Sequence, residues 1–150
     1  MSTSGRPADE LEPITQATGT IVSDQPAEQV IAIVDDEAPV RTGLARLVRS
    51  RGYRVASYAS GTDFLRSLDS SRPDCVLLDL HMPLLGGCDV LKALRTRCES
   101  IPVIVVTGNC DGNVQAQVTA LGAMVCLNKP VDAPILFDAI TSALRAGTPK

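Results

Sequence analysis

Short apolar runs alternate, from Gln29 onward, with segments whose apolar residues recur every three or four positions. Runs rich in Val, Ile and Leu are typical of strands buried on both faces, whereas the wider spacing is typical of amphipathic helices. The predicted strands are 30–34, 55–58, 75–78, 103–106 and 124–127. The helices between them should bury Val40, Leu44, Leu47 and Val48; Phe64, Leu65 and Leu68; Val90, Leu91 and Leu94; and Val114, Val118 and Leu121.

A last helix is predicted after Lys129, with Asp132 and Pro134 at its start. Its buried positions would be Leu136, Ile140, Ala143 and Leu144. Regular alternation of strands and helices predicts right-handed crossovers and therefore a parallel sheet with helices on both faces. The fold class is α/β.

A chain of 150 residues can bury one sizeable core, so one folded domain is expected. Residues 1–28 mix Ser, Thr, Gly, Pro and acidic residues with only scattered apolar ones. Such a composition buries too little surface to offset the entropy of ordering, which predicts a flexible leader. The predicted domain therefore covers 29–147, and 148–150 form a tail.

The charge balance narrows the class of protein. A formal net charge of -3 argues against a broad surface for nucleic acid. The first residues have no apolar signal core, and no apolar run is long enough to span a bilayer, so a cytoplasmic protein without membrane contact is expected. The cysteines include no Cys-x-x-Cys pair and no metal-binding spacing with the single histidine, which predicts free thiols. They are Cys75, Cys88, Cys98, Cys110 and Cys126.

Polar residues gather where the predicted strands end. Ligands of parallel α/β sheets bind beyond the carboxyl ends of the strands, where the order of connection reverses. The residues at these ends are Asp35, Asp36 and Glu37; Asp79; Thr107 and Gly108; and Asn128, Lys129 and Pro130. Carboxylates brought together there would repel one another unless a cation compensates, and Mg²⁺ prefers such oxygen ligands. A phosphoryl group held by the metal, the Lys129 ammonium and the Thr107 hydroxyl would complete this predicted site.

Four segments in this order, "IAIVDDE", "CVLLDLHMPLLGG", "VIVVTG" and "NKP", resemble the receiver domain of two-component response regulators. The similarity covers roughly residues 29 to 145. It implies a flavodoxin-like (βα)5 doubly wound fold with strand order 2-1-3-4-5. The stretches "TGNCDG" and "LGAMVCLNKP" look most like receivers that usually carry a helix-turn-helix output, so the chain is expected to be a stand-alone receiver or one cut from a longer protein.

The resemblance also implies a role for each matching acid. Asp79 would be the phosphoacceptor, a carboxylate nucleophile that takes a phosphoryl group from a phosphohistidine. Asp36 would bind Mg²⁺ directly and Asp35 would hold metal-bound water. Asp79 and the backbone carbonyl of His81 would complete the protein side of the metal site.

The residues that would respond to the phosphoryl group follow from the same resemblance. Thr107 and Lys129 match the phosphate-sensing switch residues, and Gly108 suits the small residue that leaves room for the phosphoryl group. Receivers commonly place Tyr or Phe three residues before the switch lysine, whereas this chain has Cys126. The usual aromatic readout is therefore not expected, and Cys126 would either pack as a small thiol or sense redox state.

A receiver of this kind is not an enzyme with an external substrate, because it catalyses only its own phosphorylation and dephosphorylation. The implied partners are a sensor histidine kinase or a histidine phosphotransfer protein, and a downstream protein or a second copy of the domain. The alternative function is a receiver-like module that binds a protein without being phosphorylated. A dinucleotide-binding enzyme would need a Gly-rich turn where Asp35 and Asp36 stand. A phosphatase with an aspartyl phosphate would usually have an acid at His81.

Each motif also has a purely structural interpretation. Asp35 and Asp36 could cap the first helix, since Asp is favoured there. Lys129 and Pro130 could form a plain turn. The His81 side chain could be catalytic, although the resemblance assigns only its backbone carbonyl.

Overall fold

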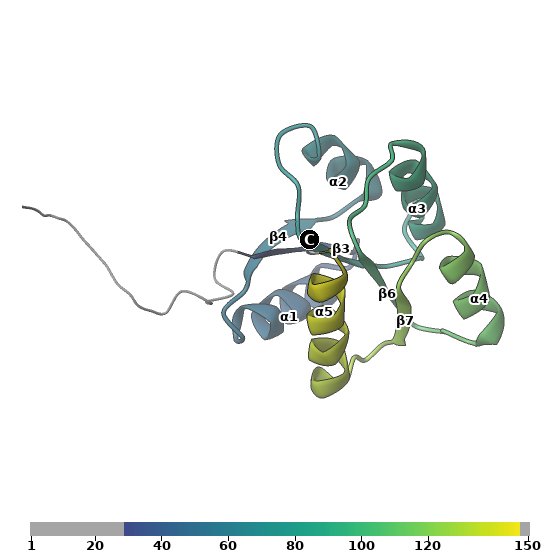
Figure 1. The fold of residues 1–150 in the computed structure, drawn as a ribbon. Helices are drawn as coiled ribbons and strands as arrows, with labels where there is room; N and C mark the ends of the chain where they lie inside the picture. The colour runs from purple at the N-terminus through teal and green to yellow at the C-terminus, as the bar shows by residue number, and fades with distance from the viewer. Residues whose placement is uncertain (1–28, 148–150) are drawn as a thin grey trace, which may run out of the picture.

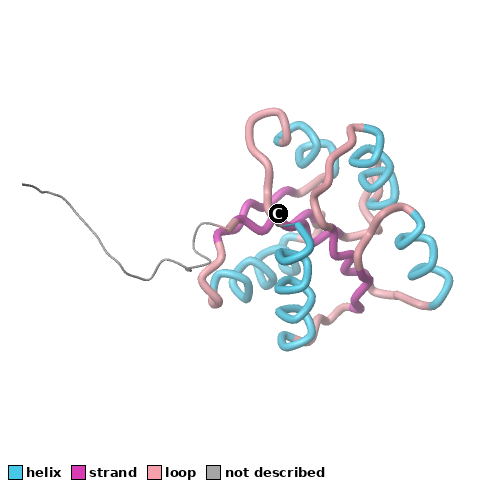
Figure 2. Tube along the Cα trace, in the orientation of Figure 1, coloured by secondary structure: helices cyan, strands magenta, loops and turns pink. Residues whose placement is uncertain are grey.

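Parallel strands and helices alternate along residues 29–147, the part of the chain that this computed structural model describes (Figures 1 and 2). The strands are β3 (Val30–Val34), β4 (Arg54–Tyr58), β5 (Cys75–Leu78), β6 (Val103–Thr107) and β7 (Val125–Asn128). The helices are α1 (Ala38–Arg49), α2 (Gly61–Ser67), α3 (Gly87–Thr96), α4 (Gly112–Ala120) and α5 (Ala133–Gly147). Every predicted element is present, and β7 begins and ends one residue later than predicted. The predicted leader and tail lie outside the described residues.

The strands form one parallel sheet in the order β4-β3-β5-β6-β7. Numbered along the described chain this is 2-1-3-4-5, which confirms the predicted doubly wound topology. The order of connection reverses between β3 and β5, because the chain leaves β3 toward β4 and then returns past β3 to β5. In sheets of this kind, ligands bind outside the carboxyl ends of the two strands at which the order reverses.

Two hydrophobic layers cover the sheet. Successive side chains of a strand point to opposite faces, so each strand contributes to both layers. Helices α1 and α5 lie on one side of the sheet and α2, α3 and α4 on the other (Figure 1). On β6, Val103 and Val105 pack toward α2, α3 and α4, whereas Ile104 and Val106 pack toward α1 and α5. The buried strands are apolar on both faces, which is why they read as continuous Val, Ile and Leu runs.

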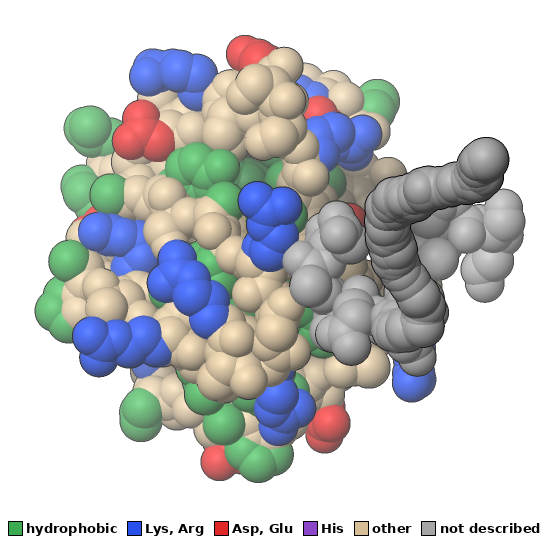
Figure 3. All heavy atoms as spheres, turned by 90° about the vertical axis from the view of Figure 1, so that its left-hand side faces the viewer, with side chains coloured by type: hydrophobic (Ala, Val, Ile, Leu, Met, Phe, Trp, Pro, Cys, Tyr) green, Lys and Arg blue, Asp and Glu red, His purple; other side chains and the backbone are tan. Residues whose placement is uncertain are grey.

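Basic side chains are spread over the surface at the β4 edge, with few acidic ones between them (Figure 3). The exposed arginines of this region include Arg46 and Arg49 in the last turns of α1, and Arg54 at the start of β4. Since α1 runs from the carboxyl end of β3 back to the amino end of β4, these charges lie at the amino ends of the strands. They therefore do not neutralise acids at the opposite edge of the sheet. Within residues 29–147, no helix has the length and apolar character needed to cross a membrane.

Helix α3 begins unusually close to the chain that leaves β5. A Cβ placed on Gly87 would lie 2.5 Å from the backbone oxygen of Asp79 and 2.8 Å from the Cα of Leu80. Both are backbone atoms, which cannot move aside as a flexible side chain can. Gly43, inside α1, is the opposite case, because a Cβ there meets nothing within 4 Å.

We expect Gly87→Ala to lower the free energy of unfolding by about 1–3 kcal/mol, because the added methyl overpacks against backbone. Gly43→Ala is the matched control, and it should raise that free energy by up to about 1 kcal/mol, since alanine favours the helix. Urea denaturation followed by circular dichroism measures both. A Gly87→Ala protein as stable as the wild type would show that α3 and the segment after β5 can separate at little cost.

Candidate functional site

Three charged side chains meet where β3, β5 and β7 end. Asp35, Asp79 and Lys129 are each the first residue after their strand. The Lys129 Nζ lies 2.9 Å from Asp35 Oδ2 and 3.3 Å from Asp79 Oδ1. The two carboxylates are almost completely buried, with 1% of Asp35 and 4% of Asp79 exposed. One ammonium thus bridges two buried acids at the point where the strand order reverses.

The backbone fixes these side chains, because the ladder of the sheet continues one residue past each strand. The Asp35 N–H donates to the Tyr58 carbonyl at 3.1 Å, and the Asp79 N–H donates to the Val34 carbonyl at 3.0 Å. The Lys129 N–H donates to the Thr107 carbonyl at 2.8 Å. The charged groups therefore sit on the rigid edge of the sheet.

Asp35 is held further by the start of α1. Its Oδ1 accepts the backbone N–H of Glu37 at 2.9 Å, and its carbonyl accepts a hydrogen bond from Arg41 Nη1 at 2.7 Å. The N-cap residue of α1 is Glu37, whose side chain makes no capping bond. Neither Asp35 nor Asp36 is thus the N-cap, and the interpretation of these acids as a simple helix cap is wrong. Asp36 is exposed at the mouth of the site.

Burial and the neighbouring charge of Asp35 raise the pKa of Asp79 above its ordinary value. The charge and hydrogen bond of Lys129, and a backbone hydrogen bond from His81, act in the opposite direction but do not offset these effects. Burial works against the Lys129 ammonium, yet the hydrogen bond and charge of Asp35, followed by those of Asp79, outweigh it and raise the pKa of Lys129. The lysine therefore stays charged, and the pair of acids still carries excess negative charge.

Asp35, Asp36 and Asp79 each place a carboxylate oxygen within 4.8 Å of those of the other two. Hard divalent cations bind such oxygen clusters, and Mg²⁺ typically takes one or two carboxylates while keeping several waters. Asp35 already faces Lys129, whereas the exposed Asp36 is open to solvent. The donor set fits Mg²⁺. His81 is exposed beside this cluster.

Thr107, the last residue of β6, is fully buried, and its Oγ1 has no hydrogen-bond partner among the described residues. A buried hydroxyl without a partner is costly and usually indicates a functional role or an additional bound group. Gly108 follows it and is exposed, and a Cβ there would meet nothing within 4 Å. Gly108 therefore adds no side chain at the carboxyl end of β6.

Two of the cysteines are joined, which corrects the prediction of free thiols. A disulfide links Cys110, in the loop between β6 and α4, to Cys126 on β7. Their Cα atoms are 6.2 Å apart, within the range that a disulfide spans. Spacing along the chain could not reveal this, since the pair is brought together only by the alignment of β6 with β7. Cys75, Cys88 and Cys98 are free thiols, as predicted.

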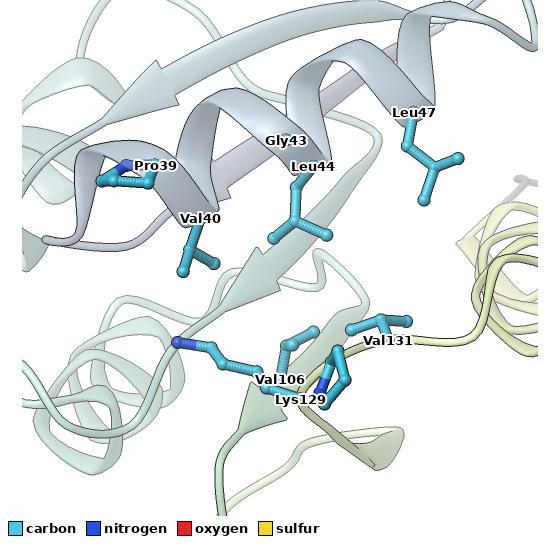
Figure 4. A pocket seen from close by; sticks show the side chains of 9 residues that line it. Pro39, Val40, Gly43, Leu44, Leu47, Val106, Lys129 and Val131 are labelled. Atoms are coloured by element: carbon cyan, nitrogen blue, oxygen red, sulfur yellow. The ribbon is translucent and has the colours of Figure 1, made fainter.

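An apolar groove of about 410 Å³ adjoins the charged cluster. Val40, Leu44 and Leu47 point into it from α1, toward Val106, Lys129 and Val131 on the opposite wall (Figure 4). Pro39, Gly43 and Pro130 complete its lining. Lys129 belongs to both the groove and the cluster, so a molecule seated in the groove would lie next to Asp79.

Sequence reasoning placed the main charged residues at this edge, and the structure brings Asp35, Asp36, Asp79 and Lys129 together. It did not foresee three supporting contacts. Arg41 binds the Asp35 carbonyl, and Glu37 lies 3.7 Å from Lys129 Nζ. Asn128 Oδ1 accepts the Cys110 N–H at 2.8 Å. Glu37 and Asn128 gave a signal in the sequence, because both lie at the predicted strand ends, whereas Arg41 gave none.

One protein family matches most of the chain. The family model for the response regulator receiver domain matches residues 31–141. The response regulator protein TmoT of Ectopseudomonas mendocina is 37% identical over 118 residues, which cover 79% of this chain and 54% of TmoT. The transcriptional regulatory protein FixJ of Bradyrhizobium diazoefficiens is 32% identical over 119 residues, covering 79% of this chain and 58% of FixJ. The chain thus spans about half the length of these curated relatives.

Solved structures agree with this result. The structure of FixJ-N is 31% identical, has a TM-score of 0.73, and is matched over 79% of this chain and 94% of its own. The chemotaxis protein CheY4 of Vibrio cholerae also gives a TM-score of 0.73 over 77% of this chain and 98% of its own. At 24% identity, CheY4 supports the fold alone.

Because the pKa of Asp79 is raised, ionisation of its carboxylate should lower the free energy of unfolding, so the stability of the fold should depend on pH. Below the ordinary Asp pKa of about 4, the group is protonated in both the folded and the unfolded protein. As pH rises through the higher folded-state pKa, the stability associated with the protonated form is lost. Without Mg²⁺, Asp79→Asn should therefore be more stable than the wild type at neutral pH, and the difference should disappear toward acid pH.

Urea denaturation at several pH values, with a chelator present, measures this difference. Asp138→Asn is the control, because Asp138 is an exposed acid on α5 far from the cluster, and its stability should follow that of the wild type. A neutral-pH stability of Asp79→Asn below that of the wild type would mean that Lys129 stabilises the carboxylate more than burial and Asp35 destabilise it.

Proposed function

The chain belongs to the response regulator receiver domain family, and on this premise we propose that Asp79 accepts a phosphoryl group from a phosphohistidine. The donor would be a sensor histidine kinase or a histidine phosphotransfer protein. The observation that supports this most directly is the buried Asp79 carboxylate, held beside Asp35 and Lys129 where the strand order reverses. The corresponding role is that of a cytoplasmic receiver domain that signals through a protein partner, and we propose no nucleic-acid or membrane surface for residues 29–147.

The reaction follows from the position of Asp79. One of its carboxylate oxygens attacks the phosphorus atom, and the bond from phosphorus to the donor nitrogen breaks, so the donor histidine leaves with the electron pair. The product is an acyl phosphate on Asp79. Lys129 would face the phosphoryl oxygens, and the free Thr107 hydroxyl would donate a hydrogen bond to one of them. Hydrolysis of the same bond resets the protein, so the chain catalyses only its own modification.

The acidic cluster would hold Mg²⁺ through Asp35, Asp36, Asp79 and the backbone carbonyl of His81. When bound, Mg²⁺ supplies positive charge that compensates both the carboxylates and the phosphoryl oxygens. Asp36 is the exposed acid of the cluster and therefore the one free to bind the metal directly. Asp35 is occupied by Lys129 and the Glu37 N–H, which suits it to hold metal-bound water.

The surface that changes on phosphorylation would lie on the side of the domain formed by β6 and β7. Thr107 ends β6, Gly108 follows it, Cys126 lies on β7, and Lys129 follows β7. New acceptor oxygens on Asp79 would draw in the Thr107 hydroxyl and the Lys129 ammonium, and so bias the loop from Gly108 to α4. A downstream protein or a second copy of the domain would read α4, β7 and α5.

The groove beside Lys129 is where we place the phosphohistidine-bearing protein. A donor must bring its imidazole to Asp79, so its surface must cover the carboxyl edge of the sheet. The groove adjoins this edge through Lys129, and its other lining residues are apolar. An apolar surface of the donor could therefore anchor there while its phosphoryl group faces the ammonium.

The alternative function, a module that binds a partner without phosphorylation, gains no support from the charged cluster. Such a module would have no need of a buried Asp79 carboxylate whose pKa is raised by burial and by the charge of Asp35, nor of a buried Thr107 hydroxyl without a partner among the described residues. Both features lower the stability of the fold, and both would contribute to binding a phosphoryl group.

The full chain incubated with acetyl phosphate and Mg²⁺ should gain one phosphoryl group, and Asp79→Asn should gain none. Intact-mass spectrometry and mapping of the labile acyl phosphate measure this. Asp74→Asn is a control, because Asp74 is an exposed acid that precedes the same strand. Labelling of Asp79→Asn at the wild-type level would refute the assignment of Asp79.

Chelation of Mg²⁺ should abolish the labelling. Asp36→Asn should raise the Mg²⁺ concentration needed for half-maximal labelling more than Asp35→Asn does, because the former loses a direct ligand. Equal Mg²⁺ requirements in wild type and Asp36→Asn would contradict a metal role for Asp36.

A large side chain at Gly43 should distinguish phosphorylation by the small donor acetyl phosphate from transfer by a protein donor. Gly43→Trp fills the groove without touching Asp79, so labelling by acetyl phosphate should be unchanged. Transfer from an autophosphorylated histidine kinase that labels the wild type, found by screening a kinase panel, should slow by about tenfold or more, as for loss of a central interface contact. Gly43→Ala is the matched control and should retain both reactions. Equal transfer to Gly43→Trp and Gly43→Ala would show that the donor does not use the groove.

A further inference from the structure

Cys110 and Cys126 join the loop that follows Thr107 to the neighbouring strand. We propose that this pair is a reversible redox site, oxidised by peroxide, whose disulfide restrains the 108–111 loop and weakens phosphoryl binding at Asp79. Only its effect on phosphoryl binding rests on the proposed function. The formation of the bond and the restraint of the loop are independent of it.

The register of the sheet places the pair beside Thr107. Cys126 pairs with Val105, and both pack on the side of the sheet that faces α2, α3 and α4. Thr107 is two residues beyond Val105, so its side chain points to the same face. The loop that leaves Thr107 therefore passes over Cys126, and the disulfide fastens it three residues after the hydroxyl that would bind the phosphoryl group.

The same loop has a second, weaker attachment to β7. The Cys110 N–H donates to Asn128 Oδ1 at 2.8 Å. This hydrogen bond does not depend on the sulfur, so it persists in the dithiol and keeps the two cysteines near each other. Their Cα separation of 6.2 Å allows a disulfide without displacement of the backbone. Oxidation thus adds a covalent restraint to this hydrogen bond.

The pair combines an accessible sulfur with a bonded partner, which the other cysteines do not. Cys110 is partly exposed, whereas Cys126 is buried, so a solution oxidant or reductant would reach the Cys110 sulfur first. Burial raises the pKa of Cys75 to about 12, which leaves that thiol unreactive. Cys88 and Cys98 are partly or fully accessible, but each is free of any disulfide. Among the described cysteines, only Cys110 and Cys126 are joined to each other.

The chemistry needs one oxidant and one reductant. The Cys110 thiol loses its proton, the thiolate attacks a peroxide oxygen and the O–O bond breaks. Cys110 becomes a sulfenic acid, and the hydroxide that leaves takes up the thiol's proton as water. The Cys126 thiol then attacks the Cys110 sulfur, which forms the S–S bond and releases a second water. A dithiol reductant reverses this by attacking Cys110, leaving Cys126 as a thiolate that takes up a proton, and resolving the mixed disulfide with its second thiol.

The proposed cytoplasmic setting favours a switch over a permanent cross-link. Thiols there are kept reduced, and disulfides that do form are usually catalytic or redox-sensing. The dithiol would be the resting state, and the loop would be free to move when Thr107 turns to a phosphoryl oxygen. In the oxidised form the Thr107 hydroxyl stays buried without a partner, and the loop cannot follow.

The first test uses the full chain, treated with hydrogen peroxide or with dithiothreitol. Differential alkylation and peptide mass spectrometry should find a 110–126 disulfide after peroxide and two free thiols after dithiothreitol. Amide hydrogen exchange should be faster in residues 108–114 of the reduced protein. Cys110→Ser should exchange like the reduced wild type under both treatments, whereas Cys98→Ser should behave as the wild type. No disulfide after peroxide, or equal exchange in both states, would overturn the proposal.

The second test measures the affinity for the phosphoryl mimic beryllofluoride in the presence of Mg²⁺, from amide chemical shifts. Oxidation of the wild type should weaken binding by about fivefold to tenfold, a coupling typical of linked sites. Binding by Cys110→Ser should not change with peroxide. Equal affinity in both redox states would overturn the coupling while leaving phosphorylation intact. Absence of beryllofluoride binding in the reduced wild type would refute the proposed function and the coupling, whereas the first test would still decide the redox site.

Discussion

The contact of one ammonium with two buried carboxylates governs the rest of this structure. Asp35 and Asp79 would repel each other strongly in a site with so little solvent, and Lys129 offsets that repulsion at 2.9 and 3.3 Å. Lys129 can reach them only because β7 pairs with β6 in a register that ends at Thr107 and Asn128. The outermost strand of the sheet is therefore tied to the chemistry at its centre.

Lys129 does not neutralise all of the negative charge in the cluster, and the remaining charge favours binding of a cation. Asp36 adds a third carboxylate to the cluster, so one ammonium leaves negative charge in excess. A divalent cation at this cluster would compensate the two negative charges that Lys129 leaves. The raised pKa of Asp79 expresses the same imbalance in the free protein. The charge pattern thus favours binding a divalent cation.

The sequence was sufficient for the elements and for the charged residues, because both are encoded locally. Buried parallel strands read as continuous apolar runs, and the first polar residue after each run marks the carboxyl edge of the sheet. The limits of β6 and β7 were missed by one residue because Thr107 and Asn128 are polar yet still paired. The disulfide and the contact of Arg41 with the Asp35 carbonyl depend on which distant segments meet, which the spacing of residues along the chain does not specify.

The alternation of side chains along β6 separates two surfaces that share one site. Val106 faces α1 and lines the groove beside Lys129, whereas Val105 and Cys126 face the opposite side of the sheet. The Thr107 side chain points to the same face as Val105, and Thr107 is the last residue of β6, at the carboxyl edge of the sheet. A donor seated on the α1 side, as proposed, would therefore leave the α4 side uncovered, so the proposed change at Thr107 would be open to a partner while the donor is still bound. The disulfide lies on that uncovered side, where it can restrain the response without obstructing the groove.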